Sequence, residues 1–477
     1  MLHDLKRLAK HSAVYGLGGV VSRVVAVFLL PLYTRYLTRD DLGAVGVLIA
    51  LSAILVTVLR GGMGSAFFRF SFDSRDPAHR RLVLRTSFWF TMSMATLGLG
   101  AGLAFAGPIA TALSLGDADL VRAAFVGLWA QMNYEQLTSL FRLEERSLAY
   151  VAASLVNIAI TIGTTILLVV VLEQGALGVI VGNFTGTLIV YLALLGYRRE
   201  QLGLQLDRRL LREMNHFGLP LVPSALALWT MNFSDRFFIT KFASLGEVGL
   251  YEIGVRIASP MVLLLTAFRM AWPAFAYSLE DDREARRTYG YVLTYLVFVT
   301  SWGALALGLL SPWLVRVLAQ PRFYEGSRVV APLAFAFAVF GCYTVVAIGV
   351  GRARRTQFNW AATGLAALVN VALNLLLIPR YGMMGAAVAT LTAYAVLFVA
   401  MTARAQRVYP VPYQWRRVGT LLGAAGALTV LGKVLDAPLP LALALIAVYP
   451  LVLLPLGFYL PGERRRLRAL VAARVGR

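Results

Sequence analysis

The sequence is poor in the residues that build metal and disulfide sites. It contains one cysteine, Cys342, and four histidines, His3, His11, His79 and His216. One cysteine cannot form a disulfide within the chain or a thiolate metal site, and the histidines share no ligand spacing. The sequence also lacks a phosphate-binding Gly-Lys-Ser/Thr loop and a nucleophile elbow. We therefore expect no catalytic residues, no metal site and no enzymatic cofactor.

Charged residues are scarce as well. They make up 14% of the chain, whereas 59% is hydrophobic and the mean hydropathy is +0.71, which excludes a soluble globular domain. Apolar runs long enough to cross a bilayer recur along the whole chain, some with isolated charges. We expect an all-α integral membrane protein with about 14 transmembrane helices, at residues 12–32, 42–59, 86–107, 123–141, 148–172, 174–197, 214–234, 248–268, 288–315, 329–351, 356–379, 381–403, 418–435 and 437–462.

Acidic residues are outnumbered by basic ones, 24 against 45, so the net charge is +21. The basic residues gather in alternate loops between the expected helices. This is the positive-inside pattern, and it places both the N-terminus and the C-terminus in the cytoplasm. The surplus of basic residues therefore indicates membrane topology and contact with membrane lipids, and it does not indicate nucleic-acid binding.

The chain repeats itself. The segment from Tyr33 to Gly43 (YTRYLTRDDLG) recurs 206 residues later as 239–249 (ITKFASLGEVG), where each copy closes one helix and opens the next. A second pair of matches joins 156–159 to 369–372 and 175–179 to 382–386. Six helices per copy is an even number, so the two copies have the same orientation and are related by a pseudo-two-fold axis along the membrane normal.

This repeat predicts the domain organisation. Residues 1–200 form an N-lobe with helices 1–6, residues 201–213 an amphipathic cytoplasmic linker, and residues 214–403 a C-lobe with helices 7–12. Residues 404–477 carry helices 13 and 14 and a basic cytoplasmic tail. A passenger site is expected near the midplane between the lobes.

Arg23 is the only charge in the first apolar run. At about 1.5 Å per residue it lies roughly 16 Å from the helix start, near the bilayer midplane. A charge there costs at least about 2.5–3.5 kcal/mol, so it normally faces a protein interior or a water-filled cavity. A cavity lined with arginine favours an anionic passenger.

Other charges also fall inside the expected helices. Glu135 pairs with an arginine further along its own helix or with a residue of another helix, and the sequence leaves both open. Glu252 and Arg256 are four residues apart, so they either form a pair or leave Arg256 to a cavity. Arg60 and Arg269 lie near the cytoplasmic ends of their helices, where long side chains reach the interface.

The loops expected on the outer side are short. Gly175 follows the fifth helix almost at once, and 243–247 is a bare turn. Membrane glycosyltransferases and polymerases that act on lipid-linked sugars generally need an extended outer loop or domain. The sequence therefore predicts a transporter and not an enzyme.

These features resemble the multidrug/oligosaccharidyl-lipid/polysaccharide (MOP) exporter superfamily and, within it, the bacterial polysaccharide (O-antigen-type) flippases. The resemblance is carried by Ser22-Arg23-Val24, the segment 30–38 (LPLYTRYLT), Gly43, Val369-Asn370 and the segment 381–390 (YGMMGAAVAT). It implies translocation of a polyprenyl-pyrophosphate-linked oligosaccharide from the cytoplasmic to the outer leaflet by alternating access, for cell-surface polysaccharide biosynthesis. The implied location is the bacterial cytoplasmic (inner) membrane.

The resemblance also implies site residues. Arg23 and Arg256 fall where lipid II flippases of the superfamily place cavity arginines on helices 1 and 8. A second arginine that those relatives place after the first is missing here, where Leu29 stands in the same stretch. Arg60 and Arg269 are the candidates to replace it at the pyrophosphate and glycan.

A cation site is implied in the same way. Some lipid II flippases hold a sodium ion with residues on helices 7, 11 and 12, and Asp235, Asn370, Asn374 and Thr390 match those places. Asn374 stands where the relatives have a second carboxylate, which removes a negative charge from the site. The alternative is that these side chains only bridge helices. Na⁺ or H⁺ is the candidate coupling ion.

Two further functions stay open from the sequence. A lipid II (peptidoglycan precursor) flippase differs from a polysaccharide flippase only by loose motifs. A multidrug or cation antiporter of the superfamily generally carries acids in its N-terminal lobe, whereas the first helix here carries an arginine. The expected partners are an undecaprenyl-pyrophosphate-linked glycan, membrane lipids, and a polysaccharide polymerase or glycosyltransferases of the same pathway.

Overall fold

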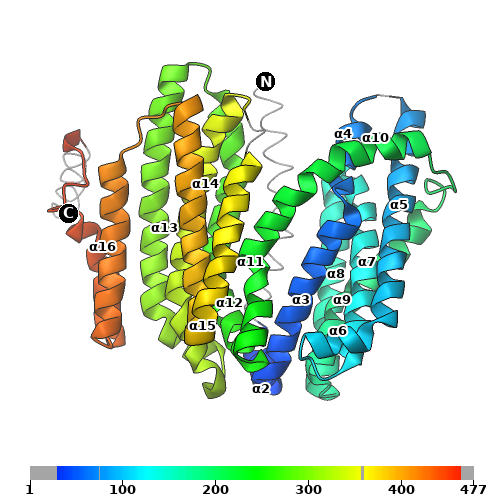
Figure 1. Ribbon diagram of the computed structural model, residues 1–477, viewed down its shortest axis with the longest axis horizontal. Helices are drawn as coiled ribbons and strands as arrows, with labels where there is room; N and C mark the ends of the chain where they lie inside the picture. Colours follow the sequence, from blue (N-terminus) through cyan, green and yellow to red (C-terminus); the bar gives the residue numbers. More distant parts are fainter. Residues whose placement is uncertain (1–28, 75, 356–358, 463–477) are drawn as a thin grey trace, which may run out of the picture. The chain divides into compact units, whose positions relative to one another are not determined.

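The computed structural model describes residues 29–74, 76–355 and 359–462, and in these ranges it is helical with no strand (Figure 1). Arg23, most of the first predicted helix (12–28 of 12–32) and the tail 463–477 lie outside the described residues. The helices are α2 (Leu30–Tyr36), α3 (Arg39–Arg60), α4 (Met63–Ser71), α5 (Pro77–Ala104), α6 (Ala106–Ala112), α7 (Ala118–Leu143), α8 (Ser147–Ile166), η1 (Leu167–Val171), α9 (Gly175–Arg198), α10 (Arg208–Gly218), η2 (Leu219–Leu221), α11 (Val222–Phe242), α12 (Leu245–Ser278), α13 (Asp282–Leu318), η3 (Pro321–Val329), α14 (Val330–Arg352), α15 (Asn359–Val408), α16 (Trp415–Val434) and α17 (Leu439–Val452).

Within the described ranges, eight helices are long and apolar enough to cross a membrane, or nine when the bent pair α5 and α6 counts as one span. The predicted all-α membrane fold is therefore confirmed, whereas the count of about 14 and the cytoplasmic termini stay predictions. Four features explain the lower count. The first predicted span falls mostly outside the described residues, and α17 has only 14 residues. α7 and α11 have the length of a span but more polar sequences, and α15 consists of two helices joined at Gly382, whose φ of 51° and ψ of −133° break the helix.

The chain divides into two compact units. Unit 1 comprises 1–256, 318–326 and 363–389, and unit 2 comprises 257–317, 327–362 and 390–477. The predicted lobes, 1–200 and 214–403, and the linker 201–213 stay predictions of domain organisation. Each unit is described below by itself.

Unit 1 has an apolar core in which α4, α5, α7, α9 and α10 meet. Phe67, Phe88, Tyr191 and Met214 are fully buried there. α10 begins at a cap in which the Asp207 carboxylate accepts hydrogen bonds from the amides of residues 209 and 210, at 2.8 and 2.9 Å. In Figure 1, α10 crosses the ends of α4 and α5. The predicted amphipathic segment thus buries one face in protein.

The two copies of the repeated turn form the same local structure. Thr38 caps α3, and its hydroxyl accepts a hydrogen bond from the Asp41 amide at 3.0 Å. At the matching place, the Ser244 hydroxyl accepts from the Glu247 amide at 3.1 Å. Both helices therefore start with a hydroxyl cap, and each carries an acid at the third position beyond it.

The acids of the two turns each hold the start of a later helix. Asp41 accepts a hydrogen bond from the Ala176 amide at 3.2 Å, and Glu247 accepts one from the Met383 amide at 2.8 Å. Ala176 and Met383 are themselves partners in the second sequence match. The two matched segments therefore meet in the same way in each copy, because a carboxylate is favourable at the amide end of a helix.

Glycine allows the two copies to touch. A Cβ at Gly43 of α3 would overlap the Leu245 carbonyl oxygen, and a Cβ at Gly249 of α12 would overlap the Arg39 carbonyl oxygen. Leu245 is the repeat partner of Arg39, so the two contacts are equivalent. Small residues at a helix interface permit this close backbone approach in membranes.

We expect Gly43→Ala and Gly249→Ala each to destabilise the protein by about 1–3 kcal/mol, because the added methyl group forces the helices apart. Thermal unfolding of purified protein in detergent measures the change. Gly100→Ala is the control, since its Cβ would meet nothing within 4 Å on the exposed face of α5. Equal unfolding temperatures for Gly43→Ala and Gly100→Ala would contradict the close contact.

Candidate functional site

Arg236 of α11 is the most completely neutralised cation of unit 1. Its guanidinium lies 2.7 Å from Asp235 Oδ1 and 2.9 Å from Glu252 Oε1, and its side chain is 6% exposed. It also donates to the Asn232 carbonyl at 2.6 Å. A buried guanidinium needs such partners because an unpaired charge in a low-dielectric interior is costly. This cluster ties the C-terminal half of α11 to α12.

The tight turn between α11 and α12 explains how the cluster forms. It brings residues 16 positions apart side by side, so that Arg236 meets Glu252 and Asp235 meets Tyr251, whose hydroxyl donates to Asp235 Oδ2 at 2.5 Å. Neither Arg236 nor Tyr251 was predicted as a site residue. The short turn is the sequence feature that could have indicated them, because it fixes the register of an antiparallel helix pair.

Arg256 has a different environment. The sequence left Arg256 either paired with Glu252 or free to face a cavity. The pair is not formed in the described structure, since the Glu252 carboxylate bonds to Arg236. The Arg256 guanidinium lies over the Tyr33 ring, 5.3 Å from its centroid. Its Nη1 is buried and, among the described residues, has no hydrogen-bond partner. Arg256 therefore retains donor capacity for an anion, and Tyr33 is a neighbour that the sequence did not reveal.

Arg60 forms an ion pair across two helices. Its Nη1 lies 2.5 Å from Glu135 Oε2 of α7, and the side chains are 16% and 35% exposed. Gln131 donates to the other carboxylate oxygen at 3.1 Å. This settles the open partner of Glu135, because Arg142 instead donates to the Ser139 hydroxyl at 2.9 Å. Arg60 is therefore part of a neutral pair.

The other two predicted arginines, Arg269 and Arg23, are not tested against these. Arg269 belongs to unit 2, is exposed, and lies over the Phe340 ring at 5.4 Å. Arg23 lies outside the described residues. A common cavity of Arg23, Arg256, Arg60 and Arg269 stays a prediction.

The predicted cation ligands form two hydrogen-bonded groups. Asp235 bonds to Arg236 and Tyr251, whereas Asn370 Oδ1 accepts from Asn374 at 3.2 Å and from Ser234 at 3.4 Å. Asn374 Oδ1 is buried without a hydrogen-bond partner in the described structure. Thr390, whose Oγ1 is likewise buried without a hydrogen-bond partner there, belongs to unit 2.

Sodium prefers several oxygen ligands, and here a guanidinium already neutralises the carboxylate. The contacts of Asp235 are those of a hydrogen-bonded bridge between α11 and α12, and the sodium site and the coupling ion stay predictions. No group of three or more His, Cys, Asp or Glu side chains that could hold a metal occurs in the part of the chain that the structure describes.

We expect Asp235→Asn and Glu252→Gln each to lower the free energy of unfolding by about 3–5 kcal/mol, because each leaves the buried Arg236 guanidinium short of a counter-charge. Thermal unfolding in detergent measures this loss. Asp119→Asn is the matched control, since Asp119 forms an ion pair with Arg122 on the exposed surface, at 2.6 Å.

The same experiment separates the bridge from a sodium site. If the bridge is correct, the unfolding temperature of the unsubstituted protein is the same in NaCl and in choline chloride. A rise in NaCl that Asp235→Asn abolishes would contradict the bridge and restore Asp235 as a sodium ligand.

Comparison with known proteins places the fold. The solved structure of the lipid II flippase MurJ in an inward closed conformation is similar with a TM-score of 0.73 and 12% identity, over 92% of this chain and 98% of that chain. An inward-facing multidrug resistance MATE family transporter of the MOP superfamily is similar with a TM-score of 0.63 and 14% identity, over 83% and 95%. At these identities the likeness shows the fold alone.

Sequence comparison gives the family. An uncharacterized membrane protein of Methanocaldococcus jannaschii is 22% identical over 204 residues, which cover 40% of this chain and 39% of that protein. The chain thus spans about two fifths of the length of this curated relative. The family described as polysaccharide biosynthesis protein matches residues 32–319, which is more than half of the chain. The protein therefore belongs to the polysaccharide biosynthesis protein family and has the fold of the MOP superfamily transporters, as the resemblance of its sequence predicted.

Proposed function

We propose that the protein is a flippase that moves a polyprenyl-pyrophosphate-linked oligosaccharide from the cytoplasmic to the outer leaflet of a bacterial cytoplasmic membrane. Membership of the polysaccharide biosynthesis family and the likeness in fold to a lipid II flippase support this proposal. The glycan would then serve cell-surface polysaccharide biosynthesis, next to the polymerase or glycosyltransferases of the same pathway.

Arg256 is the observation that carries the proposal. Its guanidinium rests on an aromatic ring and keeps a buried nitrogen without a hydrogen-bond partner among the described residues. A guanidinium suits a pyrophosphate, because its planar fork donates two parallel hydrogen bonds to phosphate oxygens. The passenger would therefore be held by its anionic headgroup while the glycan varies.

The charges of unit 1 favour an anionic passenger over a cationic one. Asp235 and Glu252 are both bonded to Arg236, and Glu135 is bonded to Arg60. None of these three interior carboxylates is available to a cationic drug without breaking an ion pair. This argues against the multidrug antiporter, whereas a lipid II flippase shares the anionic headgroup and is the second candidate.

Alternating access is the proposed mechanism. The matching contacts of Asp41 and Glu247 support an internal repeat. With it we propose two six-helix lobes related by a pseudo-two-fold axis along the membrane normal, with both termini in the cytoplasm. Two lobes of one orientation would expose a site between them first to one leaflet and then to the other. Na⁺ or H⁺ would be the coupling ion, and the membrane potential would add about 2.3 kcal/mol per charge and 100 mV.

The test is leaflet translocation of a fluorescent polyprenyl-pyrophosphate oligosaccharide in proteoliposomes. We expect Arg256→Gln and Arg23→Gln each to slow translocation by about tenfold or more, the value of a lost charge-assisted hydrogen bond. Arg122→Gln is the matched control, because Arg122 is an exposed arginine whose ion-pair partner, Asp119, is also exposed.

Each outcome of this assay decides between the functions. A full rate in folded Arg256→Gln would contradict the headgroup role of Arg256. A strong preference for lipid II over the oligosaccharide lipid would favour the second candidate. If the unsubstituted protein flips neither lipid but exports organic cations, the proposal is wrong.

A further inference from the structure

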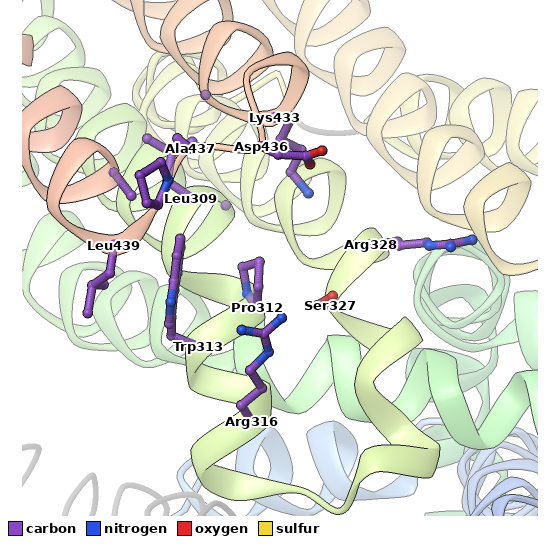
Figure 2. Close-up of a pocket in the computed structure, with 14 residues that line it drawn as sticks. Leu309, Pro312, Trp313, Arg316, Ser327, Arg328, Lys433, Asp436, Ala437 and Leu439 are labelled. Carbon is purple, nitrogen blue, oxygen red and sulfur yellow. The ribbon is translucent and has the colours of Figure 1, made fainter.

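Unit 2 contains a pocket that the transport mechanism does not use. It has a volume of about 570 Å³ and lies where α13 ends, η3 passes, and the chain turns from α16 into α17. Its polar lining consists of Arg316, Arg328, Ser327, Lys433 and Asp436. Figure 2 shows Arg316 rising from α13 toward the space beneath Lys433 and Asp436, with Arg328 extending away on the far side.

The pocket has a surplus of positive charge. Three of its lining residues are cationic and one is acidic, and none of the four forms an ion pair within the described part of the chain. Arg316 and Lys433 are also exposed, so their charges are available to a ligand. An anion in this pocket would meet donors from two different helices.

The rest of the lining is apolar. Leu309, Trp313, Leu439 and Ala442 form this wall. Arg316 stands in the last turn of α13 and Lys433 in the last turn of α16, and both helices are candidate membrane spans. The pocket therefore lies at the interface between the hydrocarbon and the headgroups, where tryptophan is enriched.

We propose that this pocket binds the phosphodiester headgroup of a membrane glycerophospholipid. Arg316 and Lys433 hold the phosphate, and Asp436 accepts hydrogen bonds from the terminal ammonium or hydroxyl groups of the headgroup. The apolar wall receives the glycerol and the first part of the acyl chains. A free phosphate would use the cations but not this wall, so the lipid fits the whole lining better. The site does not depend on the proposed flippase function.

The alternative is a structural role. A cation in the last turn of a helix stabilises that helix through its dipole, and Arg316 and Lys433 both have this position. Such a role would affect the unfolding temperature and not the choice of lipid. A binding measurement therefore separates the two explanations.

The test is a titration of the purified protein with phosphatidylethanolamine, phosphatidylglycerol and phosphatidylcholine. Native mass spectrometry measures the fraction of protein that has bound each lipid. We expect the first two lipids to bind more tightly than phosphatidylcholine, whose trimethylammonium group has no donor for Asp436. The double variant Arg316→Gln/Lys433→Gln should bind them about 30-fold more weakly, since each of the two basic residues contributes about 1 kcal/mol near a lipid headgroup and every 1.4 kcal/mol is a factor of ten. Asp436→Asn should reduce the difference in affinity between lipids with ethanolamine and lipids with choline headgroups.

Two control variants make the result decisive. Arg316→Lys/Lys433→Arg keeps both charges and should keep the affinity, whereas Arg380→Gln removes an exposed arginine outside the pocket and should change nothing. Unchanged lipid affinity in the folded double variant would overturn the proposal. This holds even if the unfolding temperature of the variant falls, because a lower temperature alone indicates the structural role. Displacement of the lipid by inorganic phosphate at equal concentration would show that the ligand is a free anion, and would overturn the lipid assignment.

Discussion

A guanidinium in a membrane interior must be neutralised, or it must face something that neutralises it. Arg236 is the clearest case of the first kind in unit 1, because Asp235 and Glu252 contact it from two helices and the Asn232 carbonyl completes its hydrogen bonds. The ion pair of Arg236 with Glu252 joins α11 to α12. Arg60 and Glu135 join α3 to α7 in the same way. Arg256 is the contrasting case, since its guanidinium lies over an aromatic ring and forms no ion pair among the described residues.

The repeated turn supplies the frame around these charges. Each copy starts a helix with a hydroxyl cap and uses an acid to hold the first amides of a later helix of its own copy. Gly43 and Gly249 then let the two copies touch backbone to backbone. Caps, acids and glycines at matching places are therefore parts of one arrangement. A change at either glycine would alter the contact between α3 and α12, next to Glu252 and its ion pair.

Much of this arrangement could be predicted from the sequence. Scarcity of charge predicts the helical membrane fold, and the matched turn residues predict that 33–43 and 239–249 have the same structure. The pairing of charges could not be predicted, because it depends on the register between helices. Glu252 illustrates this: the spacing of four residues suggests Arg256, but the turn before α12 presents the carboxylate to Arg236. The fourteen predicted spans exceed the eight or nine counted in the described ranges, because the first falls mostly outside these ranges, α7 and α11 are more polar, α15 counts as one span and α17 is short.

We propose that Arg256 is kept for the anionic headgroup of a passenger. This role is tested by the affinity of the purified protein for a series of polyprenyl lipids that carry a pyrophosphate, a single phosphate or a neutral alcohol. We expect affinity to fall along this series, and Arg256→Gln to remove most of the difference in affinity between the pyrophosphate and the alcohol. Equal affinity for all three lipids, or a series that Arg256→Gln leaves unchanged, would contradict it.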